Sequence, residues 1–560
     1  MNHSRWHLLP PIPDQRLANH PDFPPLIIQL LYNRGLTEPS QWQSFIAGDE
    51  SQFHDPFLLP GIAQAVTRIY RALLSGEKIA IYGDFDADGI SATALLVEGL
   101  SRLGSEAIPY IPHRLTEGYG LKKAALEGLY RQGVSLVITV DCGITSSAEI
   151  KAAAGMGLDV IVTDHHTPLP EIPPAVAIVN PKMPDSTYPF RELAGVGVAL
   201  KLLQALLQNL GKEEYLAGLM DLVALGTIAD LSPLLGENRY LVKEGLRQIN
   251  ASPRLGLNAM ITQAGLNPGS ISAENISWTI APRLNAAGRL EHAISSYKLL
   301  ITDSPREAYE LAAWLDQKNT ERQKLTSTFL TRAREQVLAE GVSSLLFAGD
   351  HDYPLGVAGL VAGKLSEEFY RPVIITRTGE KTTSGSGRSI PEFNIIAALT
   401  QCRHLLSQFG GHSQAAGFTL PTRNLASLQQ TLRRIAEEQL AGADLRRRLD
   451  IDAAVALPDL GGDTFQMTQL LAPFGKGNPL PIFLSRRVEV ISCRTMGNGD
   501  EHLRLKLRQD GSVWDGVAFR LGSYLAEITS HLDIVYNLEI DRWKGAERLR
   551  LNIMDFTPSI

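Results

Sequence analysis

The stretch IYGDFDADGISATALL, residues 81–96, decides how the N-terminal half of the chain folds. Its three aspartates, Asp84, Asp86 and Asp88, follow an apolar run that predicts a strand at Lys78–Tyr82. Carboxylates this close repel one another and raise one another's pKa unless a cation lies among them. The stretch therefore suggests a metal site at the end of a buried strand, provided that the rest of the chain supplies further ligands.

Strand and helix patterns alternate from this stretch onward. Further strands are predicted at Ser135–Val140 and Asp159–Thr163, and helices at Ser91–Leu103 and Ser146–Met156, with Gly89 allowing the turn into the first helix. This alternation is typical of a doubly wound α/β domain with a parallel sheet, which binds ligands beyond the carboxyl ends of its strands.

Acidic and histidine side chains recur at the ends of the next apolar runs. Asp141 follows the second strand, Asp164-His165-His166 follows the third, and Asp230 follows the run 225–229, which we also take as a strand. Each has an alternative explanation, because aspartates often cap helices and histidine pairs are often plain surface or core residues. Together they predict a site for two divalent ions, Mn²⁺ or Mg²⁺.

Composition excludes several classes of protein. The chain has 560 residues, 44% hydrophobic and 20% charged, which is too long for one core and ordinary for a globular protein. No apolar run is long enough for a membrane span, and the N-terminus lacks the pattern of a secretory signal. Three widely spaced cysteines indicate a reducing cytoplasm, and the net charge of −7 argues against coating nucleic acid by bulk charge.

A long helix is predicted to connect two domains. Ser304 is a candidate N-cap, Pro305 fits the first helical position, Glu307 completes a capping box, and the pattern runs to Glu340 before Gly341. The predicted segments are an N-terminal extension packed on the first domain (1–50), a first α/β domain with a helical region (51–300), the connecting helix (301–341), a second α/β domain (342–448) and a small β-barrel (449–560).

The C-terminal module carries a basic strand pattern. In HLRLKLR, 502–508, leucines alternate with Arg504, Lys506 and Arg508, and RLRLNI, 548–553, repeats the arrangement. A basic face on a small barrel suits a single-stranded nucleic acid, although a plain solvated strand face explains the same alternation. Among Trp514, Phe519 and Tyr524, we expect at least two to pack in the core rather than stack on bases.

The motifs GDFDADG, VDCG, VTDHH and GTIAD resemble those of the DHH phosphoesterase superfamily. The motifs PHRLTEGYG (112–120), APRLNAAGR (281–289), SGSGRS (384–389) and GGHSQAAGF (410–418) narrow the resemblance to the RecJ family. It covers nearly the whole chain from about residue 50. It implies a DHH domain, a DHHA1 domain and an OB-like barrel, and a metal-dependent exonuclease that degrades single-stranded DNA from its 5′ end in recombination and repair.

The resemblance also implies roles for single residues. The metal ligands would be Asp86, Asp88, Asp141, His165 and Asp230, with Asp141 as the bridge and Asp84 as a ligand or an orienting partner. His166 would face the scissile phosphate as a catalytic residue.

Substrate contacts are expected from basic and small polar residues in the later motifs. A flexible loop, a salt-bridged interdomain loop and a structural histidine are the respective alternatives for SGSGRS, PRLNAAGR and GGH. The expected substrate-binding residues are Arg114, Arg283, Asn285, Arg289, Ser386, Arg388, Ser389 and His412.

Two other functions remain open at this stage. A phosphoesterase of short oligonucleotides or cyclic dinucleotides would share the first two domains, but such proteins generally lack the β module. A non-catalytic scaffold would have lost carboxylates that this chain keeps. The resemblance implies single-strand-binding protein and a RecQ-type helicase as partners, and we expect a monomer.

Overall fold

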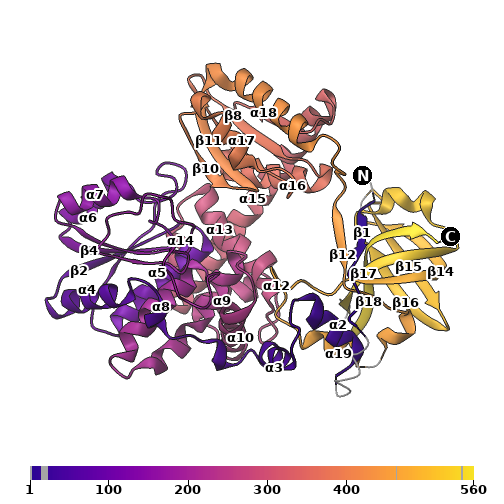
Figure 1. Ribbon diagram of the computed structural model, residues 1–560, viewed down its shortest axis with the longest axis horizontal. Helices are drawn as coiled ribbons and strands as arrows, with labels where there is room; N and C mark the ends of the chain where they lie inside the picture. Colours follow the sequence, from indigo (N-terminus) through magenta and orange to yellow (C-terminus); the bar gives the residue numbers. More distant parts are fainter. Residues whose placement is uncertain (1–2, 14–22, 462, 498, 544–545, 560) are drawn as a thin grey trace. The chain divides into compact units, whose positions relative to one another are not determined.

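The structure, a computed structural model, describes residues 3–13, 23–461, 463–497, 499–543 and 546–559 (Figure 1). The chain forms two compact units. The larger unit comprises residues 48–443, and the smaller unit combines residues 1–47 with 444–560. Among the described residues, no helix combines the length and the hydropathy that crossing a membrane requires.

The first sheet of the larger unit is wholly parallel, with strand order β3-β2-β4-β5-β6. The three predicted strands are confirmed to within one residue at each end. Ile79 and Ile81 of β2 face one side of the sheet and Ala80 and Tyr82 the other, so both faces are buried. The bounds are β2 Lys78–Gly83, β3 Ile108–Tyr110, β4 Val134–Val140, β5 Asp159–Thr163 and β6 Ala177–Val179.

Helices cover both faces of this sheet, as the doubly wound prediction requires. Helices α6 and α7 lie on one face, and α4, α5 and α8 on the other (Figure 1). Helix α5 begins at Ala87, four residues before the predicted start. The bounds are α4 Ile62–Leu74, α5 Ala87–Ser101, α6 Lys123–Arg131, α7 Ser147–Gly155 and α8 Gly195–Gln208.

A helical region follows the sheet. The prediction that Asp230 ends a strand is wrong, because the apolar run belongs to α9 and Asp230 is its C-cap. When a segment is buried on every side, its sequence is a continuous apolar run, and this pattern is the same for a strand and for a helix. The bounds are α9 Met220–Ala229, α10 Gly236–Ala251, α11 Leu255–Gln263, α12 Ala273–Asn275, a π-helical turn Ile276–Ile280, α13 Ala281–Leu290 and α14 Ile294–Ile301.

The long connecting helix α15 spans Pro305–Glu340, as predicted, and Gly341 ends it with a φ of 87°. Ser304 Oγ accepts a hydrogen bond from the Glu307 amide, which confirms the N-cap. The predicted capping box is incomplete, however. The Glu307 carboxylate accepts from the Thr302 hydroxyl instead, and that hydroxyl also accepts from the Ser304 amide.

The second α/β region has a five-stranded sheet of order β10-β11-β9-β8-β7. Only β7 and β8 are parallel, and β8, β9, β11 and β10 pair antiparallel. Helix α16 packs on β8 and β9. The bounds are β7 Leu346–Asp350, α16 Leu355–Phe369, β8 Val373–Thr378, β9 Thr382–Arg388, α17 Ile395–Gln401, β10 Gln408–His412, β11 Ala415–Pro421 and α18 Leu425–Leu440.

The smaller unit contains a closed barrel of order β14-β15-β16-β18-β17, closed by the β14–β17 pairing. The N-terminal segment was expected to pack on the first domain, but it belongs to this unit. Strand β1 pairs in parallel with β12, and helices α2 and α3 follow β1. The bounds are β1 Arg5–Leu8, α2 Pro25–Asn33, α3 Pro39–Ala47, β12 Arg448–Ile451, β13 Ala453–Ala454, α19 Thr464–Gln469, β14 Phe483–Met496, β15 His502–Gln509, β16 Ser512–Ala518, β17 His531–Trp543 and β18 Ala546–Pro558.

The alternation in β15 is confirmed, since its three leucines are buried and Arg504, Lys506 and Arg508 are exposed. Part of the basic face is neutralised locally, because Arg508 pairs with Glu489, and Arg550 with Glu539 and Asp541. The solvated-face alternative therefore accounts for Arg508 and Arg550.

Of the three aromatic residues considered, Tyr524 is buried, Trp514 is half-buried and Phe519 is 44% exposed.

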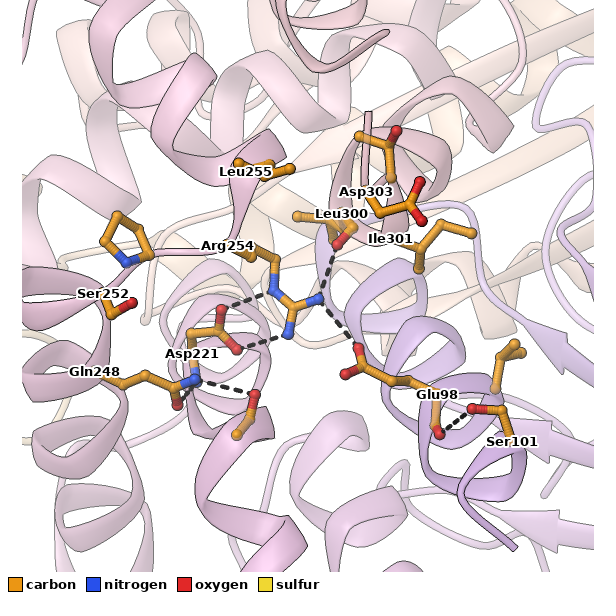
Figure 2. Close-up of a pocket in the computed structure, with 14 residues that line it drawn as sticks. Glu98, Ser101, Asp221, Gln248, Ser252, Arg254, Leu255, Leu300, Ile301 and Asp303 are labelled. Carbon is orange, nitrogen blue, oxygen red and sulfur yellow. Dashed lines mark hydrogen bonds and ion pairs between the residues drawn. The ribbon is translucent and has the colours of Figure 1, made fainter. Parts of the chain in front are cut away.

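A pocket of about 590 Å³ opens at the ends of α5 and α9 that lie farthest from the aspartate motifs (Figure 2). Arg254 crosses its floor. The guanidinium donates to both Asp221 oxygens at 2.7 and 2.9 Å, to Glu98 at 3.3 Å and to the Leu300 carbonyl at 2.8 Å. Arg254 thus ties α5, α9 and α14 together.

Replacing Arg254 with methionine is expected to destabilise the larger unit by about 3 kcal/mol, because Asp221, whose side chain is 1% exposed, would lose its counter-charge. Thermal and urea unfolding would measure the loss. The matched control is Arg306→Met, which breaks an exposed pair with Glu310 and should leave the unfolding free energy essentially unchanged. Equal midpoints for the two variants would contradict the buried-charge argument.

Candidate metal centre and substrate cleft

The aspartates of the opening stretch have distinct local roles. Asp86 is the N-cap of α5, and its Oδ1 accepts from the amides of Asp88 and Gly89 at 3.0 and 3.1 Å. Gly89 lies inside the first turn of α5, where a Cβ would approach the Asp84 backbone to 2.6 Å. Gly89 thus lets helix α5 pack closely on the end of strand β2. The prediction that Gly89 forms a turn leading into the helix is wrong.

Asp88 is held by the N-terminus of another helix. Its two oxygens accept from the amides of Gly195 and Val196, the first residues of α8, at 2.7 and 2.8 Å. At Gly226 of α9, a Cβ would lie 2.7 Å from Asp88 Oδ1. Two helices therefore leave a fitted space for this one carboxylate.

Asp141 follows β4 in a left-handed backbone conformation, with a φ of 59°. This region is costly for most side chains but tolerable for aspartate, and such residues concentrate at functional sites. A Cβ at Gly195 would lie 2.6 to 2.8 Å from the Cβ, Oδ1 and Cγ of Asp141. The glycine thus admits the Asp141 carboxylate beside the N-terminus of α8.

The pair Asp164 and His166 forms a fixed unit at the end of β5. Asp164 accepts from the amides of Ile144, His165 and His166, and Nδ1 of His166 lies 2.8 Å from Asp164 Oδ1. Burial opposes protonation of His166, but the hydrogen bond and charge of Asp164 outweigh it and raise the pKa of His166 to about 9. The pairing leaves Nε2 of His166 as the nitrogen available to a ligand.

His165 and Asp230 complete the group. Nε2 of His165 lies 3.1 Å from Asp141 Oδ1, and Nδ1 lies 4.0 Å from Asp230 Oδ2. Burial lowers the pKa of His165, which favours the neutral ring that binds metals. Three buried atoms among the described residues lack any hydrogen-bond partner here: Asp84 Oδ1, Asp141 Oδ1 and His165 Nε2.

Donor atoms of these residues gather into overlapping sets, each with all atoms within 4.8 Å of one another. Burial and then the neighbouring carboxylates raise the pKa values of Asp84, Asp88 and Asp141 well above the ordinary range. Buried acids with unpartnered oxygens and an imidazole fit a pair of hard or borderline divalent ions. The sets are Asp84, Asp86 and Asp141; Asp88, His165 and Asp230; and Asp141, His165 and His166.

Four arginines from separate elements face this edge of the sheet. Burial, together with the charges of Arg114, Arg322 and Arg388, lowers the pKa of Arg289 to about 9. The Arg114 guanidinium lies 4.7 Å from the centre of the Phe85 ring, next to Asp84. Clustered guanidinium groups with so few acids among them indicate an anion site.

Arg388 sits on β9, where its Nη1 donates to Ser386 Oγ at 3.3 Å. A Cβ at Gly359 of α16 would lie 2.8 Å from Arg388 Nη2 and 3.0 Å from Ser386 Oγ. In addition, Arg289 Nη1 donates to the Gly356 carbonyl at 3.3 Å, which brings α13 against α16. The SGSGRS segment is therefore a strand facing a close-packed helix, not a flexible loop.

Other predicted substrate residues have protein partners. Arg283 pairs with Asp316 at 2.9 Å, as in the salt-bridge alternative, although its motif forms helix α13 instead of a loop. Asn285 Oδ1 accepts from the Ala87 amide at 2.8 Å, and the Ser389 hydroxyl donates to the Phe393 carbonyl at 2.7 Å. The Asn285 contact places α13 beside the aspartate motif.

His412 lies at the end of β10, opposite the two histidines. Its ring is stacked on that of His166, with centroids 6.2 Å apart and planes 6° from parallel. Burial, and then the charge of His166, lowers the pKa of His412. The structure thus brings His412 to the predicted centre from the second sheet.

Two neighbours of the centre escaped prediction from the sequence. The Tyr119 hydroxyl lies 3.2 Å from Nδ1 of His166 and 3.4 Å from the Asp141 carbonyl oxygen, and Gly195 shapes the space for Asp141. Tyr119 belongs to PHRLTEGYG, so the motif carried a signal. Gly195 carried none, because its importance depends on a contact between distant segments.

Three segments of the chain match known domain families. Residues 78–227 match the DHH family N-terminal domain, residues 336–438 match the DHHA1 domain, and residues 451–555 match the RecJ OB domain. The parallel-sheet domain, the second α/β domain and the C-terminal barrel predicted from the sequence are thereby confirmed.

Individual relatives extend the similarity over nearly the whole chain. The single-stranded-DNA-specific exonuclease RecJ of Bacillus subtilis (strain 168) is 39% identical over 98% of this chain and 70% of its own length. The crystal structure of RecJ from Thermus thermophilus in complex with Mn²⁺ has a TM-score of 0.85 at 31% identity, covering 99% of this chain and 80% of the other. A complex of RecJ from the same organism with Mg²⁺ has a TM-score of 0.79 at 29% identity, covering 99% and 79%. The chain therefore belongs to the RecJ family.

Proposed function

We propose that this protein hydrolyses single-stranded DNA from the 5′ end, releasing 5′-mononucleotides with the help of two divalent ions, Mn²⁺ or Mg²⁺. The observation that carries the proposal is the set of buried, unpartnered carboxylate and imidazole atoms facing a cluster of arginines. The family relatives named above are single-stranded-DNA-specific exonucleases, and two of the solved structures hold Mn²⁺ or Mg²⁺. Residues 51–300 would form the catalytic domain, 342–448 the substrate-binding domain and 449–560 the nucleic-acid-binding barrel.

The ligand assignment follows from the donor sets. Asp84 and Asp86 would serve one ion, and Asp88, His165 and Asp230 the other. Asp141 would bridge them, because it shares one donor set with Asp84 and Asp86 and another with His165. When bound, two such ions lower the pKa of an attacking water and neutralise charge on the phosphate.

Side chains of the protein itself would hold the scissile phosphate and restrict the site to a single strand. Asp164 fixes the His166 ring, so that Nε2 would donate a hydrogen bond to a phosphate oxygen without reorientation during the reaction. His412 would close over His166 from the second sheet and restrict the space to a single strand.

Recognition of the 5′ end is assigned to the arginine cluster. Ser386 and Arg388 on β9 would bind the terminal phosphate, with Arg289 and Arg114 between it and the metal centre. Arg283, Asn285 and Ser389 would support this surface through their contacts with Asp316, Ala87 and Phe393.

Product analysis tests the proposal directly. With Mn²⁺, a 5′-labelled single strand should yield labelled mononucleotide from the first turnover, while a blunt duplex of the same sequence should be degraded far more slowly. Equal rates on duplex and single strand would refute the single-strand specificity. Hydrolysis confined to dinucleotides or cyclic dinucleotides would instead support the smaller-substrate alternative.

We also propose that the protein works as a monomer in a reducing cytoplasm, together with single-strand-binding protein and a RecQ-type helicase. Cys142, Cys402 and Cys493 are all free thiols, which is the normal state in a reducing compartment. A helicase that supplies single strands would feed the proposed substrate. Light scattering and pull-down with the purified partners would test these points.

Replacing Arg388 with methionine is expected to raise KM for a 5′-phosphorylated oligonucleotide by about 10- to 100-fold, because a charge-assisted hydrogen bond to phosphate is lost. The preference for a 5′-phosphate over a 5′-hydroxyl should disappear in the same variant. Arg434→Met, which breaks an exposed pair with Glu438 on α18, is the matched control. A variant that kept the wild-type preference would remove Arg388 from the site.

A further inference from the structure

Asn238 is a buried polar side chain in the first turn of α10. Its Nδ2 donates to two backbone carbonyls, that of Glu192 at 2.6 Å and that of Pro233 at 3.1 Å. Because both partners are acceptors, only the NH₂ group of the amide can face them. Oδ1 is buried as well and has no hydrogen-bond partner among the residues that the structure describes. The side chain therefore acts as a double donor that joins two loops.

One of these loops carries the Asp230 carboxylate. Pro233 lies three residues after Asp230, and Ser232 Oγ donates to Asp230 Oδ2 at 2.5 Å. Between them, Leu231 has a left-handed backbone with a φ of 60°. Leucine rarely adopts this conformation, which persists only where surrounding contacts enforce it. The bond from Asn238 to the Pro233 carbonyl is such a contact, so it helps to fix the loop that orients Asp230.

The other loop leads into the helix that holds Asp88. Glu192 lies three residues before Gly195, the first residue of α8, whose amide donates to Asp88 Oδ2 at 2.7 Å. Asp88 and Asp230 belong to the same donor set. Asn238 thus joins the supports of two carboxylates that would bind the same ion.

The first turn of α10 is fixed by a second buried group. Glu237 pairs with Lys201 of α8 at 2.6 Å and accepts from the Tyr188 hydroxyl at 2.6 Å. Each of these three residues is at most 3% exposed. A buried charged pair is costly unless its geometry is good and its remaining polar atoms are hydrogen-bonded, as they are here. Asn238 therefore extends from a rigid turn.

We propose that Asn238 is a positioning residue for one of the two metal ions, the one held by Asp88, His165 and Asp230. By joining the loops on which Asp88 and Asp230 depend, it keeps these carboxylates at the spacing that a divalent ion requires. Groups that orient metal ligands typically contribute about 10- to 100-fold in metal affinity. The inference rests on the metal centre of the proposed function, and it assigns the dependence on Asn238 to only one of the two ions.

The test is Mn²⁺ binding without DNA, measured by isothermal titration calorimetry. Asn238→Ala removes both donors, so it should weaken one of the two Mn²⁺ sites by about 10- to 100-fold and leave the other unchanged. Hydrolysis of single strands should need correspondingly more Mn²⁺ for the half-maximal rate, and kcat should recover at saturating Mn²⁺. Asn238→Thr, which has nearly the original volume and keeps one donor, should show a smaller loss, and it decides the question if the alanine variant does not fold.

Asn250 offers a matched control in the last turn of the same helix. Its Nδ2 also donates to two backbone carbonyls, those of Leu246 and Ile271, at 2.9 Å each. Asn250→Ala should lower the unfolding temperature but leave both Mn²⁺ sites unchanged. Equal Mn²⁺ affinities of Asn238→Ala and wild type would overturn the inference. An equal loss at both sites would also overturn it, because that result indicates a general structural effect.

A double-mutant cycle identifies the ion. Asp230→Asn alone should weaken the same site, so adding Asn238→Ala to it should cause little further loss. Fully additive losses would place the effect of Asn238 elsewhere and overturn the inference. A wild type that binds two Mn²⁺ ions but cleaves no single-stranded DNA would refute the proposed exonuclease function alone, because the binding comparison needs no substrate.

Discussion

Asp141→Asn is expected to reduce kcat on single-stranded DNA by about 10³-fold or more, which corresponds to roughly 4 kcal/mol of activation free energy. Asp141 is the one carboxylate shared by two donor sets, and its Oδ1 is buried without a hydrogen-bond partner. Asparagine accepts the left-handed backbone at this position and has nearly the same volume, so the change removes charge with little change in shape.

Two further measurements distinguish loss of metal from loss of fold. Mn²⁺ should raise the unfolding temperature of the wild type by mass action, and this shift should shrink in the variant. In the presence of chelator, the variant should be at least as stable as the wild type, because one charge is removed from a buried group of carboxylates. The exposed Asp185→Asn serves as the control. If Asp141→Asn kept both the Mn²⁺ shift and the activity, Asp141 would not be a ligand.

Gly195→Ala should lower kcat by about 100-fold without altering any charged residue. The added Cβ would lie 2.6 Å from the Cβ of Asp141, and the first turn of α8 also holds Asp88. One of these groups must move, and displacement of a reacting group by about 1 Å costs about 100-fold in rate.

The matched control is Gly128→Ala in the middle of α6, where a Cβ would meet nothing within 4 Å. This change should leave activity intact and stabilise the helix by up to about 1 kcal/mol. A fully active Gly195→Ala enzyme would show that the fit between α8 and Asp141 is not needed. The control would also reveal any general sensitivity of these helices to alanine.

Local pattern was sufficient to predict much of the first domain. The strands at β2, β4 and β5 are buried on both faces, so each appears as a short apolar run bounded by polar residues. The ends of α15 were predictable because Ser304, Pro305 and Gly341 act on their immediate neighbours. The convergence of Asp141 and His165 on one edge followed from the parallel topology alone.

Features that depend on distant partners were not predictable. Asp230 was assigned to a strand because nothing local reveals that α9 is buried on all sides. The ion pair between Arg283 and Asp316 and the fit of Gly195 against Asp141 both join residues that only the packing of helices brings together. Sequence spacing carries no record of such contacts.

The pairing of β1 with β12 imposes an order on biosynthesis. Leu8, at the end of β1, is synthesised roughly 440 residues before Arg448, where its partner strand β12 begins. At about 5–20 residues per second, the N-terminal strand waits roughly 20 to 90 s for its partner. The larger unit, whose residues are contiguous, can fold during that interval. Strand β1 can therefore pair only after the whole larger unit has been made, and a sequence fused before β1 would affect this late step of folding.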